Sequence, residues 1–158
     1  MVSGFISKIG KGALLFVDDG VSVNADYYQE MLEKHLVVIR RMSGKKKFTI
    51  QQDGARPHVA QSTLEYLNTN VPDYIEKENW PPYSCDLNPL DYAIWGFMET
   101  LVYKNVKRFE NLEDLKNAIR KAWDALSIRF IRRCIDQWRL RLQKVVEVRG
   151  GHIEQYFD

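Results

Sequence analysis

Three prolines within ten residues divide this chain into two parts of different character. Pro81, Pro82 and Pro89 lie in residues 80–89, a segment that cannot be the interior of a helix because proline lacks the amide hydrogen and clashes with the preceding turn. Before this segment, short apolar runs alternate with turn residues, and after it apolar residues recur at helical spacing. The length of 158 residues suits one domain. We therefore expect a single domain over residues 1–158, with strands in its first half and helices in its second.

The first half predicts a hairpin, two helices and two further strands. Residues 1–7 and 13–17 are short apolar runs separated by the turn residues 10–12, the pattern of an antiparallel hairpin. Asn24 is a good N-cap for a helix to about Arg41. One face of this helix is apolar and is formed by Tyr28, Met31, Leu32, His35 and Leu36. Strands are expected over 48–52 and 73–77, with a helix over 59–67 between them.

The second half predicts helices only. We expect one from Leu90, one after the N-cap Asn111, and a last one over 128–146 that ends before the glycine pair 150–151. This order of elements predicts an α/β fold with a mixed sheet flanked by helices.

Charge is distributed unevenly along the chain. Residues 1–100 carry 10 Lys and Arg against 13 Asp and Glu, whereas residues 101–158 carry 13 against 8. A basic C-terminal third suits an anionic partner, although a solvated helix surface explains the same charges. The candidate phosphate contacts are Lys45, Lys46, Lys47, Arg132, Arg133, Arg139 and Arg141.

Several classes of protein are excluded by composition. No apolar run approaches the 18 residues that a membrane span needs, so no membrane partner is expected. The two cysteines, Cys85 and Cys134, cannot form a disulfide framework or a four-cysteine zinc site. No glycine-rich phosphate loop and no Gly-x-Ser-x-Gly motif is present.

Two carboxylates stand where chemistry is expected. Asp53 closes a predicted strand, where α/β sheets place their ligands, but an Asp-Gly pair is also an ordinary turn. Asp91 begins a helix, where an acid is favoured by the helix dipole and where it can also be a metal ligand. Asp86 is an alternative to Asp91 as the second metal ligand, but its surroundings favour a residue that builds a turn. His58 can cap a helix, bind a group or pack.

The two loops together resemble the catalytic core of mariner-type transposases. The motifs are QQDGARPH at residues 51–58 and WPPYSCDLNPLD at residues 80–91, with 37 residues between Asp53 and Asp91. The resemblance covers essentially the whole chain. It implies a ribonuclease-H-like fold. It also implies an enzyme that cuts DNA with three carboxylates around two Mg²⁺ ions, for which Mn²⁺ can substitute. It places the second acid at Asp53 and the third at Asp91, which are then both catalytic residues and metal ligands.

Some features of the family have no counterpart in the 158 residues. The family's first catalytic Asp lies on a strand before the opening hairpin, and its helix-turn-helix modules precede that strand. We therefore expect an N-terminally incomplete catalytic domain with a weak metal site and no useful cleavage of DNA by this chain. The implied partners are DNA and a second copy of the chain, without a small-molecule substrate, and the implied location is the nucleus. The alternative functions are a nucleic-acid-binding module that no longer cuts and a dimerisation module.

Overall fold

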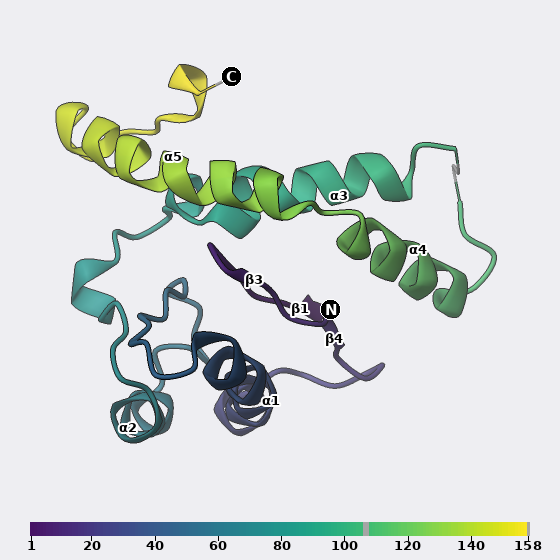
Figure 1. Ribbon diagram of the computed structural model, residues 1–158, viewed down its shortest axis with the longest axis horizontal. Helices are drawn as coiled ribbons and strands as arrows, with labels where there is room; N and C mark the ends of the chain where they lie inside the picture. Colours follow the sequence, from purple (N-terminus) through teal and green to yellow (C-terminus); the bar gives the residue numbers. More distant parts are fainter. Residues whose placement is uncertain (106–107, 158) are drawn as a thin grey trace. The chain divides into compact units, whose positions relative to one another are not determined.

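The chain folds into two compact units in the computed structural model, which describes residues 1–105 and 108–157 (Figure 1). The first unit comprises residues 1–5 and 11–84, and the second comprises residues 6–10 and 85–158. Each unit has its own buried residues. The single domain expected over residues 1–158 stays a prediction.

The opening segment is the expected antiparallel hairpin. β1 (Val2–Ser3) pairs with β4 (Leu15–Phe16) in the register Val2↔Phe16. β2 (Ile6–Ser7) and β3 (Gly10–Lys11) form a second two-stranded ladder. Gly12 is required beside this ladder, because a Cβ atom there would lie 2.1 Å from Cε1 of Phe5.

The core of the first unit lies between two helices, α1 (Ala25–Ser43) and α2 (Gln61–Asn70) (Figure 1). Asn24 caps α1 as expected, since its side chain accepts a hydrogen bond of 2.9 Å from the amide of Tyr27. The predicted apolar face is also confirmed, because four of its five residues are buried. The central cluster consists of Leu32, Leu36 and Leu67, with Tyr28, Ile39, Phe48, Ile50, Leu64, Tyr66, Val71 and Tyr74 packed around it.

The strands predicted over 48–52 and 73–77 form only one backbone bridge among the described residues. Ile50 and Tyr74 form a single parallel bridge, in which the Ile50 amide donates to the Asp73 carbonyl and the Ile75 amide donates to the Ile50 carbonyl, both at 2.9 Å. Apolar side chains at 48 and 50 pack on the core as strand residues would. A strand, however, needs a run of hydrogen-bonded neighbours, and within the described residues only this bridge forms. A 3₁₀ turn, Lys77–Asn79, follows.

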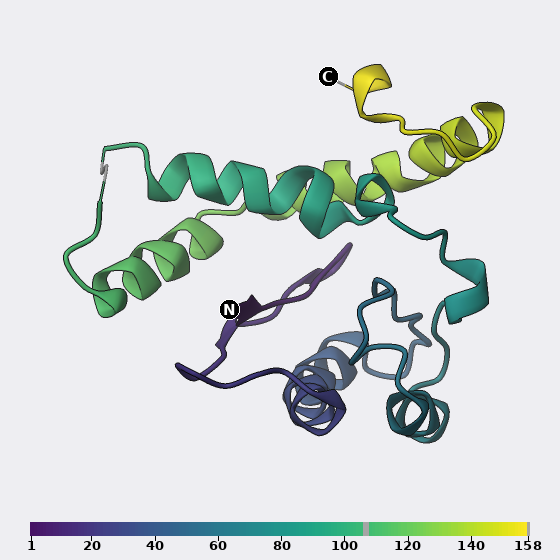
Figure 2. The ribbon, with the colours of Figure 1, turned by 180° about the vertical axis from the view of Figure 1, so that it is seen from behind.

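The described secondary structure of the second unit is helical, apart from the strand residues within 6–10. It contains a 3₁₀ turn (Cys85–Leu87), a π-helical turn (Leu90–Ile94), α3 (Trp95–Val102), α4 (Leu112–Asp124), α5 (Ile128–Glu147) and a 3₁₀ turn (Glu154–Tyr156). Figure 2 shows these helices from behind. Aromatic pairs join them. Trp95 stacks on Trp123 between α3 and α4, and Phe97 contacts Phe130 between α3 and α5.

Asn111 caps its helix as predicted, and Ser127, which was not predicted as a cap, caps the last one. The Asn111 side chain accepts a hydrogen bond from the Asp114 amide at 2.9 Å, and Ser127 caps α5 through the Phe130 amide at 3.2 Å. The C-terminus of α5 is closed by a bond of 2.8 Å from the Gly150 amide to the Val145 carbonyl, with Gly150 at a φ of 85°. No helix in the described part of the chain is both long enough and apolar enough to span a bilayer.

Candidate active site

Asp53 lies at the end of the segment that carries the single parallel bridge, in the first unit. Its Oδ1 atom accepts a hydrogen bond of 2.9 Å from the Ala55 amide and lies 2.6 Å from Nδ1 of His58. The Asp-Gly pair therefore does begin a turn, as one of the two sequence interpretations expected. The same turn holds the carboxylate, whose side chain is 44% exposed.

The environment of Asp53 favours its ionised form. The hydrogen bond with His58 is the largest cause that lowers the pKa of Asp53, followed by the bond from the Ala55 amide and the charge of His58, while partial burial opposes them. An ionised, partly exposed carboxylate is a suitable ligand for a hard cation. A small hollow beside it is lined by Gln52, Asp53, Val59, Ile75, Lys77 and Trp80.

His58 connects Asp53 to the core of the first unit. Its imidazole packs on the ring of Tyr28, with 4.2 Å between the ring centroids. The backbone carbonyl of His58 accepts a hydrogen bond of 3.0 Å from Nε2 of Gln52, whose Oε1 accepts one of 2.6 Å from the Tyr28 hydroxyl. Burial and the nearby charge of Asp53 raise the pKa of Tyr28 above its ordinary value. The sequence left the role of His58 open, and no local pattern connects it with Tyr28 thirty residues earlier.

Asp91 lies in the second unit, in the π-helical turn Leu90–Ile94, and is exposed. Its Oδ2 accepts a hydrogen bond of 2.9 Å from Nδ2 of Asn88, and Oδ1 of Asn88 accepts one of 3.2 Å from the Leu90 amide. Asn88 thus fixes both the start of the turn and the carboxylate. Because Asp53 and Asp91 belong to different units, their convergence on one metal ion stays a prediction.

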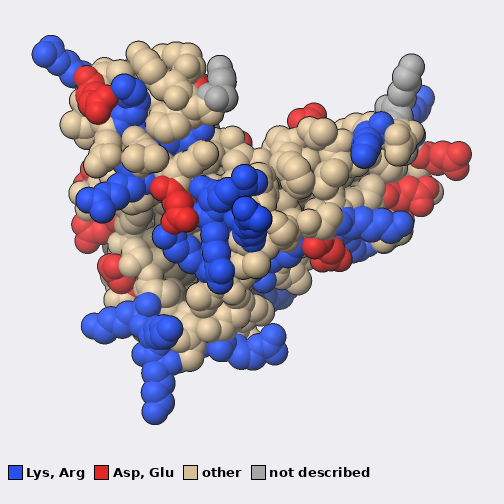
Figure 3. All heavy atoms as spheres, turned by 45° about the horizontal axis from the view of Figure 1, so that its top comes forward, with Lys and Arg blue, Asp and Glu red and all other residues tan. Residues whose placement is uncertain are grey.

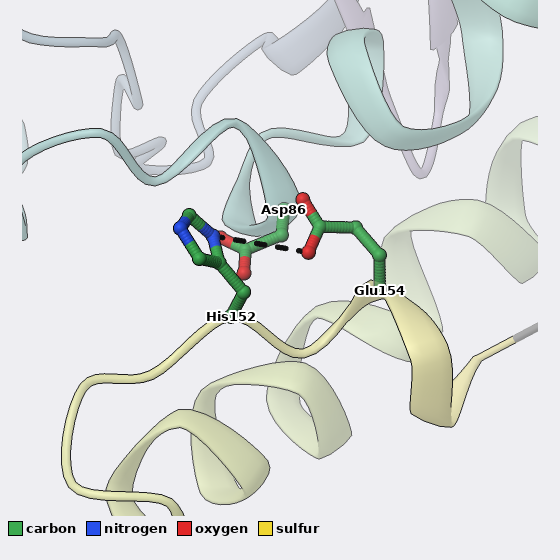
Figure 4. A group of neighbouring side chains, drawn as sticks. All are labelled: Asp86, His152 and Glu154. Atoms are coloured by element: carbon green, nitrogen blue, oxygen red, sulfur yellow. Dashed lines mark ion pairs between the residues drawn. The ribbon is translucent and has the colours of Figure 1, made fainter.

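Asp86 has a structural role, as the sequence indicated, but through a contact with a distant segment and not through the turn-building contact that was expected. It is 5% exposed, and its carboxylate accepts a hydrogen bond of 3.3 Å from the Ile153 amide. The ligand atoms of Asp86, His152 and Glu154 all lie within 4.8 Å of one another. Figure 4 shows these three side chains. His152 and Glu154 are largely exposed, and the bond to Ile153 engages the carboxylate of Asp86 with the C-terminal segment.

Six of the seven candidate phosphate contacts are exposed, and one is not. Lys45, Lys46 and Lys47 form an exposed loop after α1, and Arg132, Arg133 and Arg139 are exposed on α5. Of these, Arg132 donates a hydrogen bond of 2.8 Å from Nε to the carbonyl of Lys8. Lys and Arg side chains stand out from the face in Figure 3, with Asp and Glu among them.

Arg141 corrects the sequence interpretation. It is 5% exposed, and its guanidinium lies over the rings of Tyr92 and Phe157, 3.9 and 4.5 Å from their centroids. The sequence grouped Arg141 with the candidate phosphate contacts, but the C-terminal segment covers that part of α5 through Phe157. Arg141 is therefore a packing residue of the second unit.

Comparisons with known proteins agree with the resemblance. The chain is 29% identical to the Tc3 transposase of Caenorhabditis elegans over 97% of its own length and 45% of that protein. It is 30% identical to the human histone-lysine N-methyltransferase SETMAR over its whole length and 22% of that protein. The chain thus spans less than half of the length of these curated relatives. No family model matches it.

Solved structures share the fold. The catalytic domain of the Mos1 mariner transposase superposes with a TM-score of 0.83 over 96% of this chain and 74% of that domain, at 23% identity. A structure of the same domain with Mn and raltegravir gives a TM-score of 0.84 at 22% identity, over 96% of this chain and 76% of that one. At this identity the likeness shows the fold, which confirms the ribonuclease-H-like expectation. The chain is related to the transposases of the Tc and mariner type and has the fold of the mariner transposase catalytic domain.

Proposed function

We propose that this chain is the catalytic domain of a DNA transposase, in which Asp53 and Asp91 support metal-dependent phosphoryl transfer on DNA. The observation that carries the proposal is the state of Asp53. The Asp53 carboxylate of this chain follows the bridge segment, accepts a hydrogen bond from the Ala55 amide, lies close to Nδ1 of His58 and remains partly exposed. The chain that carries it has the fold of a transposase catalytic domain. The relatives named as transposases support the same function.

The cation that we propose is Mg²⁺, with Mn²⁺ as a substitute. The donors fit it, because Mg²⁺ prefers oxygen ligands and needs only one or two carboxylates besides water and phosphate. Solved structures of the Mos1 catalytic domain are described with Mn and with Mg. When bound, such an ion supplies electrostatic stabilisation to the oxygens of an in-line displacement at phosphorus.

The side chains of this chain would bind and orient the reactants. Asp53, with Oδ1 fixed by the Ala55 amide and His58, offers its other oxygen in a defined direction. Asn88 orients the Asp91 carboxylate in the same manner. Phosphoryl transfer depends almost entirely on positioning and charge stabilisation, so carboxylates held in this way are the groups that the reaction requires.

DNA would be bound through its phosphates. The exposed cations that we assign to this contact are Lys45, Lys46, Lys47, Arg132, Arg133 and Arg139. Contacts of this kind position a duplex without reading its sequence. Structures of Mos1 are described as paired-end complexes and a strand transfer complex, and we propose that two copies of this chain act together on DNA in the nucleus.

The test is nicking of supercoiled plasmid in Mn²⁺. It compares the 158 residues with a form extended upstream in the same reading frame, each with and without Asp53→Asn and Asp91→Asn. We expect the extended form to nick and both substitutions to abolish nicking. We expect little from the 158 residues, which match two of the three carboxylates that the resemblance implies. Nicking by either substituted form at the parent rate would overturn the proposal. DNA binding without nicking by the extended form would favour the non-cutting module instead.

A further inference from the structure

We propose that His58 is a positioning residue for Asp53, and that Tyr28 and Gln52 hold His58 in place for this purpose. The inference rests on the proposed function, in which Asp53 binds a divalent cation. It goes further by assigning a positioning role to Gln52 and His58, which lie in the first motif, and to Tyr28, which lies outside both motifs. All four side chains belong to the first unit.

The first step is the contact between His58 and Asp53. Nδ1 of His58 and the Ala55 amide both approach Oδ1 of Asp53, at 2.6 and 2.9 Å. The hydrogen bond from the amide and the close contact with the imidazole together restrict the rotation of the carboxylate about its last bond. The second oxygen, Oδ2, is then presented in one direction, which is the arrangement that a cation with strict octahedral geometry requires.

The second step is the support of His58 itself. The imidazole packs on the Tyr28 ring with an angle of 38° between the ring planes. Gln52 joins the Tyr28 hydroxyl to the backbone carbonyl of His58 through its side-chain amide. Because Gln52 directly precedes Asp53, these contacts form a closed circuit from α1 through the imidazole to the carboxylate and back along the chain.

The third step is the anchor of this circuit. Tyr28 lies on the inner face of α1 and packs against the cluster of Leu32, Leu36 and Leu67. The position of the imidazole is therefore set by contacts with the buried core of the first unit. Hydrogen-bond partners that orient a metal-binding side chain typically contribute about 10–100-fold to metal affinity.

The experiment depends on which ring nitrogen of His58 contacts Asp53. A carboxylate only accepts hydrogen bonds, so the proposed role requires the hydrogen of the neutral ring to be on Nδ1. The amide nitrogen of asparagine reaches the position of Nδ1, whereas that of glutamine reaches further, toward the position of Nε2. Mn²⁺ affinity, measured by electron paramagnetic resonance on the whole chain, should fall about 10–100-fold in His58→Ala and His58→Gln. His58→Asn should restore most of the loss.

Asp53→Asn separates the two proposals. If Asp53→Asn leaves Mn²⁺ affinity unchanged, the proposed function of Asp53 fails. If Asp53→Asn abolishes binding while His58→Ala and His58→Gln bind as the parent does, the function stands and the positioning role is wrong. Equal losses in the asparagine, glutamine and alanine variants would also contradict it, since a purely structural role gives no preference for asparagine.

One readout needs no substitution. Long-range ¹H–¹⁵N spectra of the parent chain without metal, at a pH where the ring is neutral, report the tautomer of each histidine. We expect His58 to carry its hydrogen on Nδ1. A hydrogen on Nε2 would overturn the proposal even if the variants at position 58 failed to fold.

Discussion

The guanidinium of Arg141 donates a hydrogen bond of 3.2 Å from Nη1 to the backbone carbonyl of Asp86. This contact joins α5 to the 3₁₀ turn Cys85–Leu87, which lies between Pro82 and Pro89. The Asp86 carboxylate, in turn, accepts the amide of Ile153 from the C-terminal segment. Three stretches of the second unit therefore meet at one buried pair of residues.

Substitution of Arg141 should destabilise the second unit. Arg141→Ala removes a buried hydrogen bond from a charged donor and the contacts with Tyr92 and Phe157, which together are worth about 3 kcal/mol. Arg139→Ala, on the exposed side of the same helix, should change the free energy of unfolding by less than about 0.5 kcal/mol. Urea denaturation of both variants measures the difference. Equal stabilities would show that Arg141 has no packing role.

DNA affinity should depend on the exposed cations and not on Arg141. Replacing Lys45, Lys46 and Lys47 together by alanine should weaken binding to any duplex and reduce the slope of log affinity against log salt, by about 0.9 for each phosphate that is no longer neutralised. Fluorescence anisotropy over a series of salt concentrations measures this slope. Lys121→Ala, which removes an exposed cation outside the predicted set, is the control. An unchanged slope in the triple variant would remove this loop from the DNA-binding surface.

Acid should destabilise the first unit through His35. Burial lowers the pKa of His35 to about 4, against about 6.5 for an unfolded histidine. Below pH 6.5 the unfolded chain therefore takes up a proton that the folded chain does not. Stability is complete above pH 6.5 and falls between pH 6.5 and 4, by up to about 3 kcal/mol.

The measurement is the free energy of unfolding at pH 7 and pH 4.5. His35→Gln, which has no group that titrates in this range, should lose much less stability between the two pH values than the parent. His152→Gln removes an exposed imidazole and should behave as the parent. The same acid loss in His35→Gln as in the parent would assign the effect to other groups.

Two glycines should respond to alanine in opposite directions. Gly12→Ala places a Cβ within 2.1 Å of the Phe5 ring, and the forced repacking should cost about 1–3 kcal/mol. Gly96, in α3, has no atom within 4 Å of the added Cβ, and Gly96→Ala should stabilise the chain by up to about 1 kcal/mol through helix propensity. Thermal unfolding measures both. A neutral Gly12→Ala would mean that the Phe5 ring moves away without cost.

Helices were predictable from the sequence because their causes are local. Asn24, Asn111 and Ser127 each cap a helix through a side chain three residues from its donor. The strands over 48–52 and 73–77 were not, because strand pairing depends on neighbours elsewhere in the chain, and only the Ile50–Tyr74 bridge forms among the described residues. The π-helical turn at residues 90–94 was also not predicted, because the pattern of apolar residues does not distinguish a π-helix from an α-helix.

The candidate site was predictable only in part, for the same reason. The two motifs identify Asp53 and Asp91 by resemblance. The supports of Asp53 could not be read from them, since Tyr28 reaches His58 from another element. The burial of Arg141 was hidden because Phe157, sixteen residues later, covers it.

The most direct test of the central claim is whether Asp53 and Asp91 hold the same cation. Mn²⁺ affinity is measured by electron paramagnetic resonance for the parent, Asp53→Asn, Asp91→Asn and the double variant, each shown to be folded by circular dichroism. Ligands of one ion are strongly coupled. We therefore predict that each single substitution removes most of the affinity and that the double variant binds little worse than either. Additive losses, or a single substitution without effect, would contradict the account.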